Sequence, residues 1–340
     1  MFCFTDGGEV DTHPIDTKVF DPADGFAPLT DVIEVTDPTV FERGDRWWMC
    51  VGTEVANRPG IQLATASLPA GAPLSSSGWT LAAQRDDAAK IAVLPQERSR
   101  PWDVKGGRHC PSYVKGWDPS TRQWVERIYY AGAADFVWGP YTIGYLEWDG
   151  ERWIDQPAPV FVATEPWERA SVYEPNVIYA DGMWKLWYVA GSNADDYLVQ
   201  SFAESEDGRR NWSQRQIFAP EAMKMFDFHV RSCEAGYEAV FSRVSLRGVP
   251  PPETGLWRCS CARPSSRLDD WSEPVQIITA ADRGWHSGPW KPCAVDFANG
   301  LLVFFSGAYL VQNKGPFPVV FTLGCLEFRG HEIPSQNRHK

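Results

Sequence analysis

The stretch SVYEPNVIYADGMWKLWYVAGSN, residues 171–193, contains two runs of strand-forming residues separated by a turn signal. The run 177–179 (VIY) leads into Asp181-Gly182, and large apolar residues then alternate along the segment that follows. Because Asp-Gly supplies the positive φ of a tight turn, the pattern predicts an antiparallel hairpin. An acid, Glu174, stands directly before the proline that opens this hairpin, where an isolated strand gains nothing from a carboxylate.

The parts of this stretch recur in the same order five times along the chain. Each copy has a strand, a turn, an aromatic strand ending in a small residue, a variable loop, a third strand and a closing strand near a tryptophan. This order predicts a single all-β domain over residues 1–340, a five-bladed β-propeller with about four antiparallel strands per blade. Residues 1–30 are expected to supply a strand that closes the ring. The blades are expected at approximately 31–80, 105–155, 168–213, 222–272 and 284–330.

The composition agrees with many short strands joined by frequent turns. The chain has 17 Trp, an aromatic share of 14%, and 28 Gly and 27 Pro spread along its length. A large β-sandwich, or a pair of them, is the alternative fold. It would explain the strands but not the fivefold order of parts.

Charge and hydropathy limit the partners. The formal net charge is −12, and no basic stripe of the kind that binds phosphate is visible, so nucleic acid is not expected as a partner. No apolar run approaches the roughly 18 residues that cross a bilayer, so no membrane partner is expected either. The start, MFCFTDGGEVDTH, lacks the features of a signal peptide, which predicts a cytoplasmic protein.

The eight cysteines are scattered and form no C-x-x-C pair. They are expected to be buried free thiols in a reducing compartment rather than disulfides, and no zinc site is expected.

In a propeller the first strand of every blade lines the central channel, so residues at equivalent positions meet around one funnel. Five polar groups distant in sequence are therefore expected to converge. They are Asp37, His109-Cys110, Glu174, the segment from Asp227 to His229, and Trp290-Lys291.

Carboxylates brought together from different blades disfavour one another's charge, so one is expected to hold a proton while another stays ionised. A protonated acid and an ionised carboxylate are the groups that cleave a glycosidic bond. The sequence thus predicts a glycoside hydrolase of a small oligosaccharide or glycoside, using paired-carboxylate catalysis by Asp37 with Glu174 or Asp227 in the funnel. No cofactor is expected to be required.

The chain resembles the five-bladed glycosidases of the family 43 and family 32 type. The resemblance is carried by TDPTVF (36–41), by RHCPSYV (108–114) with the aromatic strands that follow, and by YEPNVIYADGMWKLWYVAGS (173–192). In the family 43 pattern a first-blade Asp is the general base, which falls on Asp37. The third-blade Asp of that pattern, which tunes the pKa of the general acid and orients the substrate, corresponds to Glu174 here.

The chain departs from that pattern at two positions. The third blade carries Glu174 in place of Asp, and the fourth-blade acid, a Glu followed shortly by Pro, has Asp227 as its nearest match with no proline. These departures leave open whether Glu174 or Asp227 is the acid, and also leave open a degenerate or repurposed site. The resemblance further implies a structural calcium or a water on the axis, held partly by a histidine.

Cations, imidazoles and loop aromatics near the strand starts are expected to bind substrate. Flat rings stack on the apolar face of a sugar, and cations stabilise ionised acids. The expected substrate-binding residues are Arg108, His109, Trp138, His229, Arg231, His286, Trp290 and Lys291.

Two functions from other classes stay open. One is a carbohydrate- or metabolite-binding propeller without hydrolysis, which the unusual segment FDFHV (226–230) favours. The other is a glycoside phosphorylase or transferase, in which phosphate would be held by Arg108, His109, Arg231 and Lys291.

Overall fold

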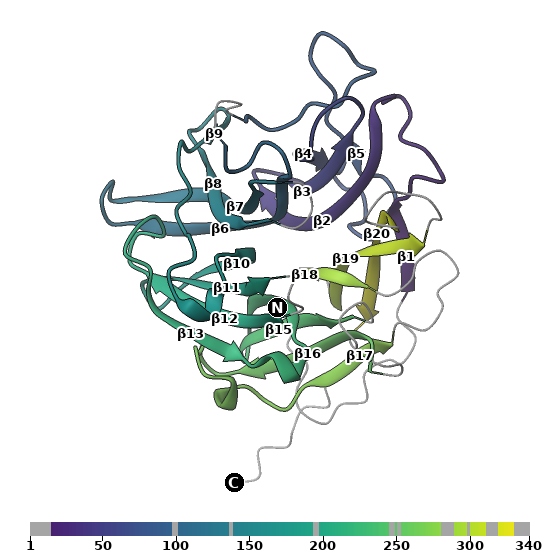
Figure 1. The fold of residues 1–340 in the computed structure, drawn as a ribbon. Helices are drawn as coiled ribbons and strands as arrows, with labels where there is room; N and C mark the ends of the chain where they lie inside the picture. Colours follow the sequence, from purple (N-terminus) through teal and green to yellow (C-terminus); the bar gives the residue numbers. More distant parts are fainter. Residues whose placement is uncertain are drawn as a thin grey trace.

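The computed structural model describes residues 15–96, 101–135, 139–192, 197–244, 249, 253–279, 289–297, 300–310 and 319–329. The described residues form β-strands β1 to β20 and three short 3-10 helices, η1 (Pro166–Glu168), η2 (Glu221–Met223) and η4 (Leu268–Asp270). The described part is therefore all-β, as predicted. Figure 1 shows its sheets arranged around a common centre.

The hairpin predicted from residues 171–193 is confirmed. Ala180 pairs with Met183 around Asp181 and Gly182, whose φ values of 54° and 78° are those of a tight hairpin turn. The hairpin opens a four-stranded antiparallel sheet. Its strands run in the order β10 (Val172–Ala180), β11 (Met183–Ser192), β12 (Tyr197–Ser205) and β13 (Ser213–Ala219).

The next segment of the chain repeats this order in a second four-stranded sheet. Its strands are β14 (Phe226–Cys233), β15 (Gly236–Arg243), β16 (Gly255–Cys261) and β17 (Val275–Thr279).

Residues 32–155 form one larger sheet that consists of two four-stranded halves. A single parallel pair, Ile61 with Gly107, joins the halves. The first half contains β2 (Val32–Arg43), β3 (Arg46–Val55), β4 (Ile61–Ser67) and β5 (Thr80–Leu81). The second half contains β6 (Gly107–Asp118), β7 (Gln123–Ala133), β8 (Tyr141–Trp148) and β9 (Trp153–Asp155).

The last sheet joins the two ends of the described chain. β1 (Ile15–Phe20) pairs antiparallel with β20 (Val319–Arg329), Ile15 lying opposite Glu327. β19 (Gly300–Leu310) and β18 (Trp290–Phe297) complete the order β1-β20-β19-β18. The outer strand of this sheet thus comes from the beginning of the sequence.

The first strands of successive four-stranded units contact one another. β2 contacts β6, β6 contacts β10, β10 contacts β14, β14 contacts β18, and β18 contacts β2. Residues at the same position in these strands are therefore brought to a common centre, called the hub below.

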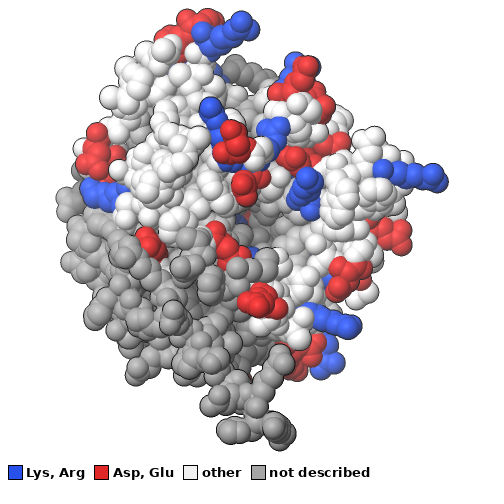
Figure 2. Space-filling view, turned by 180° about the vertical axis from the view of Figure 1, so that it is seen from behind, with Lys and Arg blue, Asp and Glu red and all other residues white. Residues whose placement is uncertain are grey.

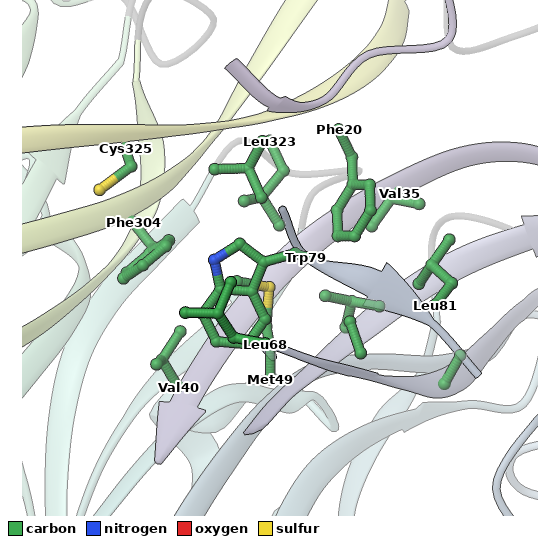
Figure 3. Packing of buried hydrophobic residues seen from close by; sticks show 14 of the residues in the cluster. Phe20, Val35, Val40, Met49, Leu68, Trp79, Leu81, Phe304, Leu323 and Cys325 are labelled. Atoms are coloured by element: carbon green, nitrogen blue, oxygen red, sulfur yellow. The ribbon is translucent and has the colours of Figure 1, made fainter. Parts of the chain in front are cut away.

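Apolar clusters fill the space between each pair of neighbouring units. Side chains along β11 point alternately to the two faces of its sheet, and so reach both neighbouring units. Trp184 packs toward the second unit and Trp187 toward the fourth, and both are fully buried. Figure 3 shows the cluster between the fifth and first units, where the rings of Trp79 and Phe304 meet edge to face at 5.9 Å. The tryptophans and aromatic strands that mark each repeat are thus the material that joins one unit to the next.

Cysteine usage differs in part from the sequence prediction. Six described cysteines are free and buried, but Cys233 is disulfide-bonded. The remaining cysteine, Cys3, lies outside the described residues. Disulfides are rare in reducing compartments, so this bond does not support the predicted cytoplasmic location, which stays a prediction.

Within the described ranges, no helix has the length and apolar character that a membrane crossing needs. On the face shown in Figure 2, acidic and basic side chains are interspersed, and the basic ones do not gather into a stripe.

Candidate active site

Five residues at equivalent positions of the first strands share an unusual backbone conformation. Each lies at a break in the register with the second strand of its unit. A positive φ in a residue other than glycine costs about 1–3 kcal/mol, and such strain gathers at functional sites. The five residues and their φ values are Asp37 (53°), Cys110 (52°), Glu174 (52°), Asp227 (55°) and Lys291 (45°).

The sequence encodes four of these breaks through the proline that follows. Pro38, Pro111, Pro175 and Pro292 have no N–H to give to the neighbouring strand, so the ladder is interrupted there and a bulge is tolerated. In the fourth unit Phe228 stands in place of proline, yet the same break is present, because the register shifts between Phe226 and His229.

The sequence offers the segment 227–229 for the fourth unit, and the structure selects its first residue. Asp227 is the residue equivalent to Asp37 and Glu174, both in its φ and in its place at the register break. Without proline the fourth copy carries no local signal of the bulge, and this is why the sequence alone leaves the position within 227–229 undecided.

Asp37 is held from two neighbouring units. Its Oδ2 accepts hydrogen bonds from the Cys110 N–H at 3.2 Å and from the Cys110 thiol at 3.4 Å. Its own N–H donates to Ser306 Oγ at 2.7 Å, and the Thr36 hydroxyl donates to its Oδ1 at 2.9 Å. The Ser306 hydroxyl in turn lies 3.5 Å from Oδ1, so groups from the first, second and fifth units hold this half-buried residue in one orientation.

Asp227 is held in a similar way but is more deeply buried, with 8% of its surface exposed. Its Oδ2 accepts hydrogen bonds from the Ser242 hydroxyl and, at 3.1 Å, from the Lys291 N–H. Both donors thus bind one oxygen of the carboxylate and fix its orientation.

The hub brings the three predicted acids into one electrostatic environment. Glu174, which is half-buried, acts on both Cys110 and Lys291, and so do Asp37 and Asp227. Burial lowers the pKa of Lys291, but Cys110 and the three acids raise it more, so its pKa lies above the ordinary value. The same acids and burial hold the pKa of the Cys110 thiol well above its usual range, opposed by Lys291.

A belt of hydrogen bonds lies below the hub, two residues further along each first strand. Each side chain of the belt binds the backbone of the next unit, so the belt passes through all five units. Its bonds are Tyr113 N to Thr39 Oγ1 (3.1 Å), Val177 N to Ser112 Oγ (3.0 Å), Val230 N to Asn176 Oδ1 (2.8 Å), Val40 N to Cys293 Sγ (3.2 Å), and a hydrogen bond of His229 with the Ala294 backbone.

His229 belongs to this belt rather than to the hub surface. Its Nδ1 lies 3.1 Å from Asn176 Nδ2, and since an amide nitrogen only donates, Nδ1 accepts and the imidazole is neutral. Burial, with the charges of Lys291 and Arg231, lowers the pKa of His229 to about 3, although its bond with the Ala294 backbone raises it.

A calcium ion fits these residues poorly. The axial cavity is about 10 Å³, and its polar atoms on Thr39, Ser112 and Asn176 accept backbone N–H groups. Calcium takes six to eight oxygen ligands, whereas this cavity is lined by prolines and by the cationic Lys291. Among the described residues no group of three or more His, Cys, Asp or Glu side chains could hold a metal ion.

His109 and Trp290 lie directly before the hub residues of their strands, and both are partly exposed. His109 donates Nε2–H to the Gly106 carbonyl at 2.9 Å, and its ring meets Tyr141 edge to face at 5.8 Å. Burial lowers its pKa, although Asp37 and the Gly106 bond raise it, so its neutral form leaves Nδ1 as an acceptor. Trp290 packs near the ring of Phe321, at 5.7 Å.

The two arginines predicted to bind substrate instead contact backbone carbonyls and carboxylates of the protein. Arg108 is fully buried and donates to the carbonyls of Pro95 at 2.6 Å and Leu94 at 2.9 Å. Arg231 forms ion pairs with Glu238 and Asp296, both at 2.7 Å, and so links β14 to β15 and β18. Trp138 and His286 lie outside the described residues.

Sequence reasoning missed the two serines that hold the acids. Ser242 and Ser306 lie in the second strands of the fourth and fifth units, opposite Phe226 and Trp290. Each follows a phenylalanine, and that repeated Phe-Ser pair is the signal that could have identified them. The other three units have apolar residues or glycine at this position.

At the level of sequence the chain matches no family model, and no curated protein matches it either.

Comparison with solved structures finds the same fold over nearly the whole chain. A thermostable family-43 glycoside hydrolase is 14% identical, covers 90% of this chain and 93% of its own, and has a TM-score of 0.59. The catalytic domain of a Coprinopsis cinerea GH62 alpha-L-arabinofuranosidase is 13% identical, covers 92% and 95%, and has a TM-score of 0.58. A GH130 protein, from a family of mannoside phosphorylases that contains glycoside hydrolases, is 10% identical, covers 94% and 95%, and has a TM-score of 0.57. At these identities the likeness shows the fold alone.

Proposed function

We propose that the chain is a glycoside hydrolase that cleaves a small oligosaccharide or glycoside at the hub. The observation that carries the proposal is the meeting of three carboxylates, Asp37, Glu174 and Asp227, at equivalent strained positions of three different units. The fold shared with family-43 and GH62 structures supports it, because those proteins are named as glycoside-cleaving enzymes.

The proposal includes a closed five-bladed propeller formed by residues 1–340 as one domain. Its support is the run of contacts between successive first strands and the belt that passes from each unit to the next and back from the fifth to the first. The pairing of β1 with β20 agrees with a closing role for the N-terminal segment.

Asp37 is the general base in this proposal. Its carboxylate accepts from the Cys110 N–H and thiol and from the Thr36 hydroxyl, and hydrogen bonds to the charged form favour that form. An ionised carboxylate held in one orientation is what activating a water or attacking a sugar requires.

Glu174 is the general acid, and Asp227 is a positioning residue. Asp227 is deeply buried and one oxygen of its carboxylate is bound by the Ser242 hydroxyl and the Lys291 N–H, so it is poorly suited to donate a proton. Glu174 is more exposed and has one more methylene, which suits it to reach a leaving-group oxygen in the funnel.

The substrate is an uncharged sugar at a chain end, and no cofactor takes part. His109 offers Nδ1 as an acceptor for a hydroxyl, and Trp290 offers a partly exposed ring beside the hub. Such a pairing of a polar acceptor with a flat apolar surface is typical of sugar recognition.

Hydrolysis is favoured over phosphorolysis by the places of the arginines. Phosphate would need free cations at the hub, but Arg108 is bound to the Leu94 and Pro95 carbonyls and Arg231 is paired with Glu238 and Asp296. The charge of Lys291 is already offset by the three acids, which would also repel a phosphate.

The test is a panel of aryl glycosides and short oligosaccharides, followed by proton NMR of the products with and without phosphate. Release of a free reducing sugar that does not depend on phosphate is the expected result. A sugar 1-phosphate would indicate a phosphorylase. Calorimetric binding of a sugar with no cleavage of any panel member would indicate a binding propeller, and either result would reject the proposal.

A further inference from the structure

The fifth unit carries a cation where three other units carry an acid. Lys291 has the same positive φ and the same register break as Asp37, Glu174 and Asp227. Only 7% of its surface is exposed, and with Asp227 it lines the small cavity on the axis. A buried ammonium costs several kcal/mol unless its neighbours compensate the charge, so its presence here needs a reason.

The neighbours of Lys291 give that reason. The titratable groups that act on it come from four strands: Asp37 on β2, Cys110 on β6, Glu174 on β10 and Asp227 on β14. His229, which shares the cavity wall, is neutral and faces Asn176 through an accepting nitrogen. Lys291 therefore shares the hub with three carboxylates and two uncharged groups, and its own N–H is bound to Asp227.

Nothing else among the described cations takes this place. Arg231, the next basic residue along β14, is paired with Glu238 and Asp296. Arg108 is turned to the carbonyls of Leu94 and Pro95. The cavity suits calcium poorly, because its oxygens accept backbone N–H groups.

We infer that the Lys291 ammonium is the internal cation of the hub, a positioning residue whose charge offsets the mutual repulsion of Asp37, Glu174 and Asp227 in place of a metal ion. Three carboxylates at one centre repel one another, and an ammonium among them offsets that repulsion. The role of Lys291 in activity rests on the proposed function, but its electrostatic role does not.

The first test uses His229 as a probe, because Lys291 is one cause of its low pKa. Nitrogen-15 NMR of the imidazole is recorded for the wild type, Lys291→Met and Lys291→Arg. Loss of the ammonium is expected to raise the titration midpoint of His229 by about 1 pH unit, since a like charge nearby shifts a pKa by about that much. Lys291→Arg keeps a cation and is expected to keep the midpoint low. An unchanged midpoint in Lys291→Met would overturn the inference.

The second test measures kcat/KM against pH on the best substrate of the panel. Lys291→Met is expected to lose about 10²-fold, as enzymes do when one preorganised charged group is removed. The acidic limb of its profile is expected to move to higher pH, which a merely structural defect would not do. Lys185→Met, which removes a partly buried lysine paired with Glu204 on another strand, is the matched control and is expected to change neither quantity.

The third test is chemical rescue of Lys291→Ala. Added propylammonium is expected to raise kcat/KM of this variant at least about tenfold, while propanol, which has a similar size, is expected to leave it unchanged. Equal rescue by both compounds, or activity of Lys291→Met within twofold of the wild type, would count against the inference. A wild type that cleaves no glycoside would defeat the proposed function alone, because the His229 titration would still decide the role of Lys291.

Discussion

The backbone N–H of Cys110 donates to Oδ2 of Asp37 at 3.2 Å, across the boundary between the first and second units. The donor and the acceptor are the strained residues of two neighbouring strands, both with φ near 52°. The same relation recurs between the Lys291 N–H and Oδ2 of Asp227, at 3.1 Å. The strain therefore has a use: the bulge turns a backbone N–H toward the acid of the preceding unit.

Replacement of Asp37 by Asn is expected to lower kcat/KM by about 10²–10⁴-fold, the usual contribution of a general base. The amide keeps the shape of the side chain, so thermal unfolding is expected to change little. Kinetics on the best aryl glycoside and a melting curve measure the two effects. Asp181→Asn, in a turn of the third unit, is the control. A variant at Asp37 with wild-type turnover would remove the mechanism.

Glu174→Gln is expected to lose activity according to the leaving group. A glycoside with a poor leaving group needs a proton on the departing oxygen, so its cleavage is expected to fall by about 10²–10⁴-fold. A dinitrophenyl glycoside leaves without that proton, and its cleavage is expected to fall far less. Asp227→Asn should slow both substrates alike. If Asp227→Asn shows the dependence on the leaving group instead, Asp227 is the general acid and Glu174 is the positioning residue.

Ser306→Ala is expected to weaken both the fold and the site. The change removes the acceptor of the Asp37 N–H, and an unpaired buried donor costs about 1–3 kcal/mol. Urea unfolding measures the loss of stability, and kcat/KM is expected to fall because Asp37 is less firmly held. Ser306→Thr keeps the hydroxyl and should recover part of both. Full activity in Ser306→Ala would show that this serine does not position Asp37.

Stability is expected to fall with acidification because of His229. Its pKa is lowered to about 3 in the folded protein, against an ordinary 6.5, so below pH 6.5 the unfolded chain binds a proton that the folded protein does not. The contribution of His229 to the free energy of unfolding is fully present above about pH 6.5. It is lost at up to about 1.4 kcal/mol per pH unit as the pH falls toward 3. His109, whose pKa is also lowered, adds in the same direction.

Urea unfolding at a series of pH values measures this slope. His229→Gln keeps a side chain able to hydrogen-bond within the belt, and it is expected to flatten the slope below pH 6.5. An equally steep slope in that variant would show that other groups cause the acid sensitivity.

The local elements of this protein were predictable from its sequence. Asp181-Gly182 fixes a hairpin whatever surrounds it, and the X-Pro pairs at Asp37 and Glu174 mark breaks in their strands, because the cause in each case lies within a few residues. Where that local signal is missing, as at Asp227 before Phe228, the sequence narrows the position only to the segment 227–229. The order of strands, repeated five times, was enough to predict an all-β chain with its acids at equivalent positions.

Only the tertiary structure decided which side chains meet. Ser306 reaches Asp37 from a strand 269 residues later, and Arg108, one residue from His109, turns to Leu94 and Pro95 instead. Neighbouring residues of a strand point to opposite faces, so a shift of one position separates a hub residue from a buried structural one. Sequence specifies each strand and turn through short-range sterics, whereas the hub is made by packing five strands together, a long-range event that no local pattern records.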